Sequence, residues 1–458
     1  MNIDLDLVRK FNVPGPRYTS YPPAPHFTEE FDRAEVLRHI DCANEKAERD
    51  LSLYFHLPFC ESLCWFCGCT TIITTRRDVS GRYLDYLERE MDLMREHIHP
   101  ARKVAQLHLG GGTPTFLSPG ELRRIGEMVR SRFPLHPDLE AGVEVDPRRL
   151  TEEKVRALAD AGFNRASMGV QDNDPKVQKA VHRIQPFEMT QRTVEWMRNH
   201  GFVSVNIDLI YGLPHQTPQS FEKTIDEVLT LRPDRFAVFS YAHVPWIKPA
   251  QKILTEKILP TPEVKLELLK LTTEKLTANG YRYIGMDHFA REDDELTIAQ
   301  REKTLQRNFQ GYSTQKGVDI HAFGMSSISQ STDVYWQNHK ELDAYYADLD
   351  AGRLPWMKGY ILSREDEIRR QTIMRVMCDL ELDFSAMSES LGVDFKNHFA
   401  AELDSLADLE ADGLVERSDN RLVVTESGRL FIRVIAMRFD EYLVKGKKNQ
   451  KGRFSKVI

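Results

Sequence analysis

The chain repeats one supersecondary unit, and this repetition limits the folds open to it. Short apolar segments of strand length recur with helical patterns between them, at intervals of about 25–40 residues after the second segment. They lie at 51–57, 104–109, 141–145, 165–170, 203–210 and 235–240. Strands and helices that alternate in this way form parallel sheets with helical crossovers. The pattern predicts an α/β fold, and periodicity alone leaves open whether the sheet forms a barrel or an open doubly wound layer.

Polar or glycine-rich residues follow the predicted strands. These strand tips are Gly110–Thr115, Asp146-Pro147, Gln171-Asp172, Tyr211–Pro214 and Tyr241–Pro245. In barrels and open α/β sheets alike, ligands bind at the carboxyl ends of the strands. We therefore expect the active site at these tips.

The two ends of the chain differ from this middle part. Five prolines between residues 14 and 25 exclude a regular helix there, so residues 1–35 are predicted to form an extended arm. Helical patterning follows at 33–48. After about residue 355 the pattern changes to amphipathic helices, including 364–379 and 398–412, then a hairpin turning near 418–420 and a further helix. We predict an arm (1–35), a catalytic barrel (36–354) and a mainly helical, winged-helix-like C-terminal domain (355–458).

Charge and composition narrow the partners of the protein. A net charge of −7 over 458 residues disfavours a nonspecific grip on nucleic acid, and residues 355–458 hold 17 basic against 18 acidic residues. A structural or lid role for the C-terminal domain is the better hypothesis, and the basic last 14 residues are interpreted as a solvated tail. The N-terminus lacks the basic and apolar regions of a signal peptide, and no stretch approaches 18 apolar residues. We expect a cytoplasmic protein without membrane insertion.

Four of the six cysteines lie within ten residues, as Cys60, Cys64, Cys67 and Cys69. In a reducing compartment such clustered thiols indicate metal ligands or redox groups before disulfides. Three thiolates at the spacing Cys-x3-Cys-x2-Cys can hold one face of an iron–sulfur cluster from a single loop. A zinc site with four cysteine ligands usually takes two pairs from separate hairpins, so four ligands within ten residues fit it less well. Redox disulfide chemistry and a chance grouping of thiols are two further interpretations of the same residues.

The cysteine spacing resembles the signature of the radical S-adenosylmethionine enzymes. In that superfamily three cysteines hold a 4Fe–4S cluster whose fourth iron binds S-adenosylmethionine. The run Gly110-Gly111-Gly112-Thr113-Pro114 lacks the following lysine of a phosphate-binding loop. It resembles the superfamily's glycine motif for the methionine end, with glycine at the usual acidic position. Alone, such a run is also typical of a tight turn.

A closer resemblance extends over nearly the whole chain. The motifs that carry it are Pro14–Pro22, the cysteine loop, 110–115, 144–148, 167–172, 206–214, 285–290 and 307–312. Together they are similar to the oxygen-independent coproporphyrinogen III oxidase family. The resemblance implies an incomplete (β/α)6 barrel with an arm and a helical C-terminal domain. It also implies oxidative decarboxylation of two propionates of coproporphyrinogen III to vinyl groups, which gives protoporphyrinogen IX in haem biosynthesis.

The resemblance also implies a cofactor set and its contacts. Cys60, Cys64 and Cys67 would ligate one 4Fe–4S cluster, and two molecules of S-adenosylmethionine would bind. The first would contact Tyr54, Gly111, Glu144 and Ile328, and the second Phe66, Gly112, Thr113, Gln171, Arg183, Asp208 and Ala242. Each of these residues is by itself equally compatible with a structural cap, packing contact or ion pair.

Cys69 cannot be a fourth ligand if one iron is to stay open, so its role is auxiliary and unassigned. The resembling oxidases carry this cysteine, whereas a related haem-binding chaperone without decarboxylase activity, the alternative hypothesis, typically lacks it. Arg17, Tyr18, Gln310 and Tyr312 are candidate substrate contacts, with packing of surface loops as the alternative. We expect a monomer with an electron donor and acceptor that the sequence does not identify.

Overall fold

The computed structural model describes residues 3–45, 49–445, 454 and 456, which group into two compact units. The sheet unit comprises Phe27–Leu268 and Gly317–Ile361. The terminal unit comprises Met1–His26, Leu269–Lys316 and Leu362–Ile458. Residues 269–316, which the sequence assigned to the barrel, thus group with the two ends of the chain. All but three residues of the basic tail (445–458) lie outside the described part.

Six parallel strands form the centre of the sheet unit, where the sequence predicts them. They are β1 (Leu51–Leu57), β4 (Val104–Gly111), β5 (Leu135–Val145), β6 (Arg165–Gln171), β7 (Ser204–Tyr211) and β8 (Arg235–Ser240). Each hydrogen-bonds to the next in this order, and all adjacent pairs are parallel. The prediction of consecutive βα units is therefore confirmed.

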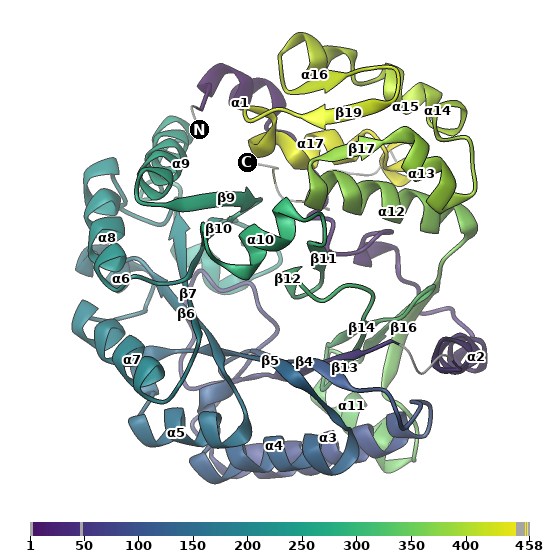
Figure 1. Ribbon diagram of the computed structural model, residues 1–458. Helices are drawn as coiled ribbons and strands as arrows, with labels where there is room; N and C mark the ends of the chain where they lie inside the picture. Colours follow the sequence, from purple (N-terminus) through teal and green to yellow (C-terminus); the bar gives the residue numbers. More distant parts are fainter. Residues whose placement is uncertain (1–2, 46–48, 446–453, 455, 457–458) are drawn as a thin grey trace. The chain divides into compact units, whose positions relative to one another are not determined.

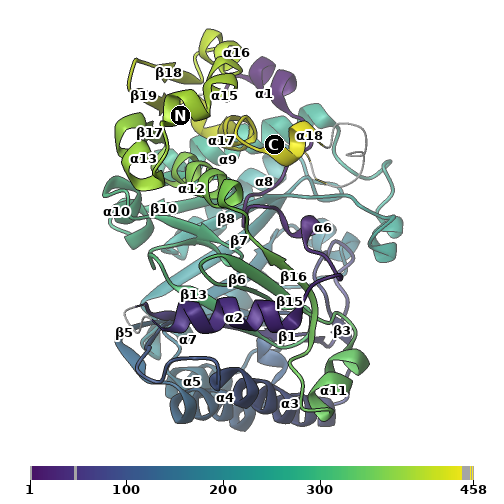
Figure 2. The same ribbon diagram turned by 90° about the vertical axis from the view of Figure 1, so that its right-hand side faces the viewer.

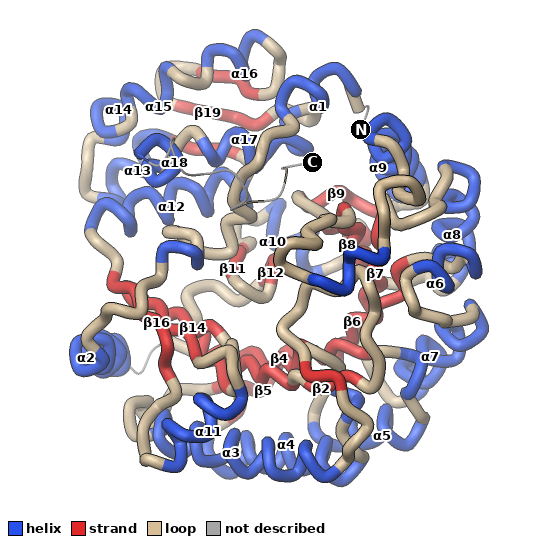
Figure 3. The backbone as a smooth tube through the Cα atoms, turned by 180° about the vertical axis from the view of Figure 1, so that it is seen from behind, coloured by secondary structure: helices blue, strands red, loops and turns tan. Residues whose placement is uncertain are grey.

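Helices cover one face of these strands. They are α3 (Asp78–Arg95), α4 (Pro119–Arg132), α5 (Glu152–Ala161), α6 (Pro175–Ala180), α7 (Phe187–Asn199) and α8 (Pro218–Thr230). Along β6, buried and half-buried residues alternate, because successive side chains of a strand point to opposite faces. Figures 1 and 3 show the strands curving in an arc with α3, α4, α5, α7 and α8 on its outer side. The side chains of the inner face are thus left to build the site.

Local sequence signals set where these helices begin. Ser118 and Glu121 form a capping box at the start of α4, in which each side chain accepts from the other residue's backbone N–H. Thr217 and Ser220 make the equivalent pair at α8. Proline occupies the first turn of both helices, where its missing N–H costs nothing. The helices consequently start directly after the strand tips.

Four further strands extend the sheet beyond β1. They are β13 (Asp319–Phe323), β14 (Ile328–Gln330), β15 (Val334–Asn338) and β16 (Trp356–Ile361). β13 is parallel to β1, and the last three are antiparallel to their neighbours. Helix α2 (Arg33–Asn44) packs on β15 and β16, as Figure 2 shows, and α11 (Leu342–Asp350) contacts α3. The helix predicted at 33–48 is present, and residues 46–48 lie outside the described part.

The terminal unit is mainly helical. Its helices are α1 (Leu5–Phe11), α10 (Glu295–Arg301), α12 (Arg364–Asp379), α13 (Phe384–Leu391), α14 (Phe395–His398), α15 (Ala400–Asp404), α16 (Ala407–Ala411), α17 (Ile432–Met437) and α18 (Glu441–Lys445), with α9 (Pro262–Ala278) leading into it from the sheet unit. Its hairpins are β9–β10 (Tyr281–Gly285, His288–Arg291) and β11–β12 (Gln306–Asn308, Gly311–Ser313). A three-stranded sheet joins β17 (Glu381–Asp383), β19 (Arg421–Val424) and β18 (Val415–Arg417). Helices followed by this small sheet fit the predicted winged-helix-like arrangement.

Two details of the ends differ from the prediction. The helix expected at 398–412 is divided into α14, α15 and α16, and at one division the Ser405 hydroxyl donates to the carbonyl of Glu402. Such local side-chain bonds compete with helix continuation. The proline-rich string forms no α-helix, as predicted, although its last proline lies in the short 3-10 helix η1 (Ala24–His26). Helix α1 precedes the string because the Asp4 carboxylate caps two backbone N–H groups. Across the described residues, we find no helix with the length and apolar character needed to cross a bilayer.

Candidate active site

The cysteine loop connects two short strands, β2 (Phe59–Cys60) and β3 (Ile72–Ile73), which pair with each other. Its backbone is fixed by the Cys67 N–H, which donates to Cys64 at 3.0 Å, and by the Trp65 N–H, which donates to Val181 at 3.0 Å. The segment that follows β8 also binds the cysteine loop, through Lys248 and Gln251. The Gln251 amide donates to the carbonyl of Phe66 (3.0 Å), and Lys248 Nζ donates to that of Cys69 (2.8 Å). The loop is therefore anchored at several points along its length.

The three predicted ligands differ in their surroundings. Burial raises the pKa of Cys60 to about 11, and its sulfur lies 3.2 Å from the Thr113 hydroxyl. Cys64 is 9% exposed and its sulfur faces two guanidinium groups. A hydrogen bond from Cys69 lowers the pKa of Cys67 to about 6, in spite of burial. Thiolates are the form that binds metals, so Cys67 is the ligand that ionises readily, whereas Cys60 would bind with loss of a proton.

Cys69 contacts Cys67. Its backbone N–H donates to the Cys67 sulfur at 3.4 Å. The side-chain hydrogen bond between the two thiols raises the pKa of Cys69, so Cys69 keeps its proton while Cys67 loses one. Cys69 is thus a hydrogen-bond partner of a predicted ligand, and its functional role stays unassigned.

The glycine run turns directly behind the loop. Gly111 has φ +109°, which is typical of glycine, and a Cβ there would lie 2.6 Å from the His56 ring. The Gly112 N–H donates to Leu57 at 2.8 Å, and the Thr113 N–H donates to Phe59 at 2.9 Å. These bonds bring the run against the start of the cysteine loop. Gly111, Gly112 and Thr113 thus lie next to the cysteine loop, within reach of a molecule bound to it.

Glu144 projects from the end of β5 toward this turn. Its carboxylate accepts from the Gly111 N–H at 3.1 Å and lies 3.7 Å from His108 Nε2. Burial alone would raise the pKa of Glu144, but the hydrogen bond and charge of His108 hold it below the ordinary value. Tyr54 on β1 stacks on His108, with ring centroids 5.9 Å apart. The site therefore keeps an ionised carboxylate beside the glycine turn.

Asp208 lies on the same face, two strands away on β7. Its carboxylate accepts from the Ser167 hydroxyl at 3.2 Å and from the Asn206 amide at 2.6 Å. Burial first, and then the charge of Glu144, raise the pKa of Asp208 to about 7. One carboxyl of the inner face is thus firmly ionised and the other changes its charge near neutral pH.

Gln171 and Arg183 meet at the end of β6. Gln171 has φ +70°, an uncommon conformation for a residue with a side chain, and its buried Oε1 has no hydrogen-bond partner. Arg183 donates to the carbonyl of Gly169 at 2.6 Å, and its buried Nε likewise has no partner. A Cβ on Gly169 would lie 2.6 Å from the Gln171 amide nitrogen and 3.2 Å from Arg183. Glycine at this position leaves room for both side chains.

The remaining predicted cofactor contacts lie around the same edge of the sheet. Phe66 packs against an apolar cluster that includes Val181 and Tyr241. Ala242 follows β8 and is exposed. Ile328 begins β14, whose Gln330 pairs with Ile320 of β13, and β13 in turn pairs with β1, which carries Tyr54. Strand β13 thus lies between the strand of Ile328 and the strand of Tyr54 in the sheet.

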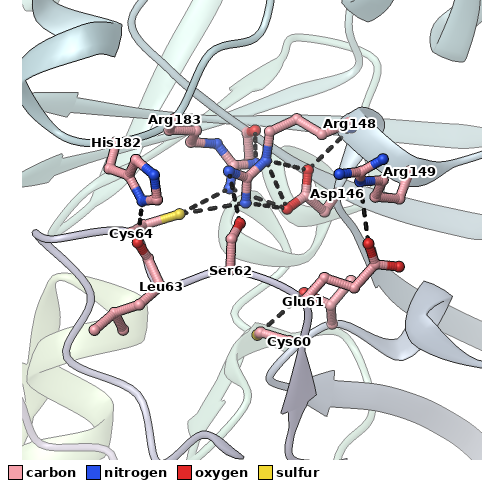
Figure 4. A network of polar contacts seen from close by, with 12 residues as sticks. Cys60, Glu61, Ser62, Leu63, Cys64, Asp146, Arg148, Arg149, His182 and Arg183 are labelled. Atoms are coloured by element: carbon pink, nitrogen blue, oxygen red, sulfur yellow. Dashed lines mark hydrogen bonds and ion pairs between the residues drawn. The ribbon is translucent and has the colours of Figure 1, made fainter. Parts of the chain in front are cut away.

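A cavity of about 330 Å³ opens beside the cysteine loop. Cys60, Ser62, Thr113, Asp146, Arg148 and His182 are among its lining residues. Asp146 accepts from Arg148 at 2.6 Å and from Arg183 at 3.3 Å. Burial opposes ionisation of Asp146, but the charges of the two arginines lower its pKa to about 2. Figure 4 shows these side chains gathered against Cys64.

The four candidate substrate residues lie in the terminal unit. Arg17 pairs with Asp287, and its side chain is 41% exposed. Tyr18 is 1% exposed and donates to Asp440 at 2.8 Å. Tyr312 is 9% exposed and donates to the carbonyl of Met377 at 3.2 Å. Gln310 lies in the turn between β11 and β12 and is half-buried. The two tyrosine hydroxyls are thus engaged inside the unit, while Arg17 and Gln310 retain exposed surface.

Comparison with known proteins identifies the family of the chain. Residues 54–228 match the model of the Radical SAM superfamily, and residues 362–431 match that of the HemN C-terminal domain. The oxygen-independent coproporphyrinogen III oxidase of Helicobacter pylori (strain J99) is 45% identical over 458 residues, which cover 100% of this chain and 99% of the relative. The chain belongs to the oxygen-independent coproporphyrinogen III oxidase family. The member from Escherichia coli (strain K12) is 46% identical over 456 residues, which cover 99% of this chain and 98% of that one.

The oxidase fold is confirmed over nearly the whole chain. A solved structure described as "Coproporphyrinogen III oxidase (HemN) from Escherichia coli is a Radical SAM enzyme" superimposes with a TM-score of 0.92 and 44% identity. It covers 97% of this chain and 100% of that chain. The radical SAM sheet and the helical C-terminal domain are therefore features that this family member shares with a solved relative.

Sequence reasoning left several polar residues of this oxidase site without a role. Asp146 and Arg148 lie within a motif that resembles the family, but nothing in their spacing indicates that they meet Cys64. His108, Ser167 and Asn206 precede the strand tips and were not predicted as site residues. The signal that identifies Ser167 and Asn206 is the period of two, because they lie four residues before Gln171 and two residues before Asp208 on the same strands.

Proposed function

We propose that this chain catalyses the oxidative decarboxylation of coproporphyrinogen III to protoporphyrinogen IX. The observation that carries the proposal is the cysteine loop, anchored beside Gly111 and Glu144 in a chain that matches oxidases of this name from end to end. In the reaction each of two propionates loses a hydrogen atom, carbon dioxide and one electron, and becomes a vinyl group. Two molecules of S-adenosylmethionine would be converted to methionine and 5′-deoxyadenosine.

The donor set fits a 4Fe–4S cluster held by Cys60, Cys64 and Cys67. Each ligand of such a cluster binds a different iron, so its sulfurs lie farther apart than those around one ion. Within the described residues, which include all six cysteines, no three His, Cys, Asp or Glu side chains converge as they would on a single metal ion. The spacing of the cysteines within one loop favours a cluster, because a zinc ion held by four cysteines usually takes two pairs of ligands from separate hairpins. When bound, the cluster would supply the electron that cleaves S-adenosylmethionine.

The chain's own residues would bind and orient two molecules of S-adenosylmethionine. Glu144 is held as a carboxylate by His108 and the Gly111 N–H, and so can accept from an ammonium group. Asp208 can accept from ribose hydroxyls, and its pKa of about 7 ties this role to neutral or higher pH. Arg183 keeps a buried Nε for a carboxylate, and the buried Oε1 of Gln171 is a further acceptor.

We further propose Arg17 and Gln310 as contacts to the propionates. A guanidinium forms two parallel hydrogen bonds to a carboxylate, and Arg17 retains exposed surface beside its ion pair with Asp287. The hydroxyls of Tyr18 and Tyr312 are buried and bonded to Asp440 and Met377, which favours a structural role for these two residues over contact with substrate. The cytoplasmic location, the monomeric state and the identity of the electron donor and acceptor stay predictions or open assignments.

An anaerobic product assay tests the proposal. The protein is reconstituted with iron and sulfide, reduced with dithionite and given S-adenosylmethionine with coproporphyrinogen III. We expect protoporphyrinogen and 5′-deoxyadenosine, both absent when S-adenosylmethionine is omitted. Tight haem binding without any vinyl product would instead identify the chain as a haem-binding chaperone, and the oxidase proposal would be rejected.

A further inference from the structure

Two arginines donate to the sulfur of Cys64, and neither contact belongs to the proposed binding of substrate. Arg148 Nη2 lies 3.3 Å from the sulfur and Arg183 Nη1 lies 3.6 Å from it (Figure 4). Both guanidinium groups are largely buried, with side-chain exposures of 16% and 9%. These donors are therefore close to the sulfur and poorly screened by water.

Asp146 fixes the position of Arg148. Its carboxylate accepts from Arg148 Nε at 3.0 Å, from Arg148 Nη2 at 2.6 Å and from the Arg148 backbone N–H at 3.0 Å. The two residues occupy the start of η3 (Pro147–Arg149), directly after β5. The third member of this turn, Arg149, takes another direction, since its side chain is 71% exposed and pairs with Glu61 at 3.1 Å. The chain thus offers two adjacent arginines, of which only Arg148 contacts a predicted ligand.

We propose that Arg148, oriented by Asp146, is a positioning residue that raises the reduction potential of the cluster through its hydrogen bond to Cys64. The inference rests on the proposed function, because it takes Cys64 as a ligand. Reduction adds one electron and forms no bond, so it increases the negative charge on the cluster and its sulfurs. Hydrogen bonds and positive charge at a ligand sulfur stabilise that reduced form, and burial strengthens them. Arg183 would contribute in the same direction from its longer distance.

The test is a redox titration of the reconstituted cluster without S-adenosylmethionine or substrate, followed by electron paramagnetic resonance. For Arg148→Met we expect the ratio of reduced to oxidised cluster at a fixed potential to fall about tenfold, which is 59 mV for one electron. Arg148→Lys keeps the charge but loses the planar fork, so we expect an intermediate shift. Arg149→Met removes a neighbouring arginine of the same turn and should leave the potential unchanged.

The iron and sulfide content of every variant is measured alongside. An unchanged potential in a fully loaded Arg148→Met protein overturns the proposal, and so does an equal shift in Arg149→Met, because generic surface charge would then explain it. If Arg148→Met does not take up the cluster, the Arg148→Lys variant provides the test. A reduction potential equal to that of the wild type overturns the proposal, and a lowered potential supports it. A wild-type protein that loads the cluster but makes no protoporphyrinogen would reject the proposed function and leave this comparison intact.

Discussion

Cys64 is the most enclosed of the three proposed ligands, and its environment differs from that of the other two. Cys60 faces a hydroxyl and Cys67 faces a thiol, whereas Cys64 faces two buried positive charges. Both guanidinium groups lie within hydrogen-bond distance of the Cys64 sulfur, at 3.3 and 3.6 Å. At the scale of single residues, the loop therefore offers three chemically different positions to one cofactor.

Replacement of Cys64 by serine should abolish cluster binding. A serine hydroxyl is a harder and far less acidic ligand than a thiol, so it competes poorly for iron in a sulfur-bridged cluster. We expect the iron and sulfide content of reconstituted Cys64→Ser to fall at least tenfold, with loss of S-adenosylmethionine cleavage. Cys42→Ser, at an exposed position of α2, supplies the matched control and should keep full content. Full iron and sulfide content in Cys64→Ser would show that the ligand assignment is wrong.

Gly169 offers a second test at the residue scale. A methyl group there would displace Gln171 and Arg183, whose side-chain ends can move, so the protein should still fold with a loss of about 1–3 kcal/mol. We expect Gly169→Ala to bind S-adenosylmethionine at least tenfold more weakly, as measured by equilibrium dialysis. Gly120→Ala adds its methyl group to open space on α4 and should bind normally. Equal affinity in the two variants would remove Gln171 and Arg183 from the proposed site.

At the scale of elements, helix α3 is tied to the sheet through one buried carboxyl group. Glu90 is 2% exposed and accepts from the Gly324 N–H (2.8 Å), the Asn338 amide (2.6 Å) and the Tyr345 hydroxyl (2.7 Å). In spite of these three donors, burial raises the pKa of Glu90 to about 7. One side chain thus joins α3 to the end of β13, to β15 and to α11.

The raised pKa of Glu90 makes stability depend on pH. Between the unfolded pKa of 4.5 and the folded value of about 7, the native state holds a proton that the unfolded state has released. Stability from this group is therefore complete below pH 4.5 and declines as the pH rises to 7. Glu90→Gln cannot titrate, so its free energy of unfolding relative to the wild type should rise by about 3 kcal/mol across that window.

Urea unfolding at a series of pH values checks this expectation. Glu127→Gln, at an exposed position of α4, provides the control and should follow the wild type at every pH. A difference between Glu90→Gln and the wild type that stays constant with pH would show that Glu90 does not titrate in this range.

The elements that the sequence predicts well are those whose signals are local. The six parallel strands and α12 follow from apolar periodicity, and the hairpin of β18 and β19 turns at the predicted residues because a short polar turn separates two apolar runs. Strands β13 to β16 were missed, since β13 is buried along its whole length and shows no alternation. Helix α1 was missed because its cap, Asp4, precedes the proline string on which the prediction of an extended arm rests.

At the scale of the whole molecule, the limit of sequence reasoning is the pairing of distant segments. Cys60, Cys64 and Cys67 could be assigned together because they share one loop. In the terminal unit, by contrast, Tyr18 bonds Asp440 and the Arg433 guanidinium bonds the carbonyl of Pro16, across more than 400 residues of sequence. No spacing or periodicity encodes such partners. Tyr18 could therefore be predicted as a substrate contact although its hydroxyl is engaged within the fold.

Winged helices often bind nucleic acid, but the charges of this winged-helix-like part do not favour such binding. Helix α13 holds one acidic and no basic residue. The arginines of the β18–β19 hairpin are already paired, Arg417 with Glu410 at 2.8 Å and Arg421 with Glu381 at 2.5 Å. Phosphate contacts that would replace these ion pairs leave carboxylates next to the DNA backbone, so the wing gains little from binding.

We therefore expect no measurable DNA binding by the full-length protein. Binding to duplex DNA is driven by the release of counterions as lysine and arginine neutralise phosphates, and this chain carries a net charge of −7 with its wing arginines engaged. In a fluorescence anisotropy titration with a labelled duplex, the signal should stay flat at about 0.15 M salt, near physiological ionic strength. Glu381→Gln and Glu410→Gln together free two wing arginines and provide a gain-of-charge comparison. Binding by the wild type that weakens steeply with added salt would contradict the expectation and assign the C-terminal domain a role in nucleic-acid recognition.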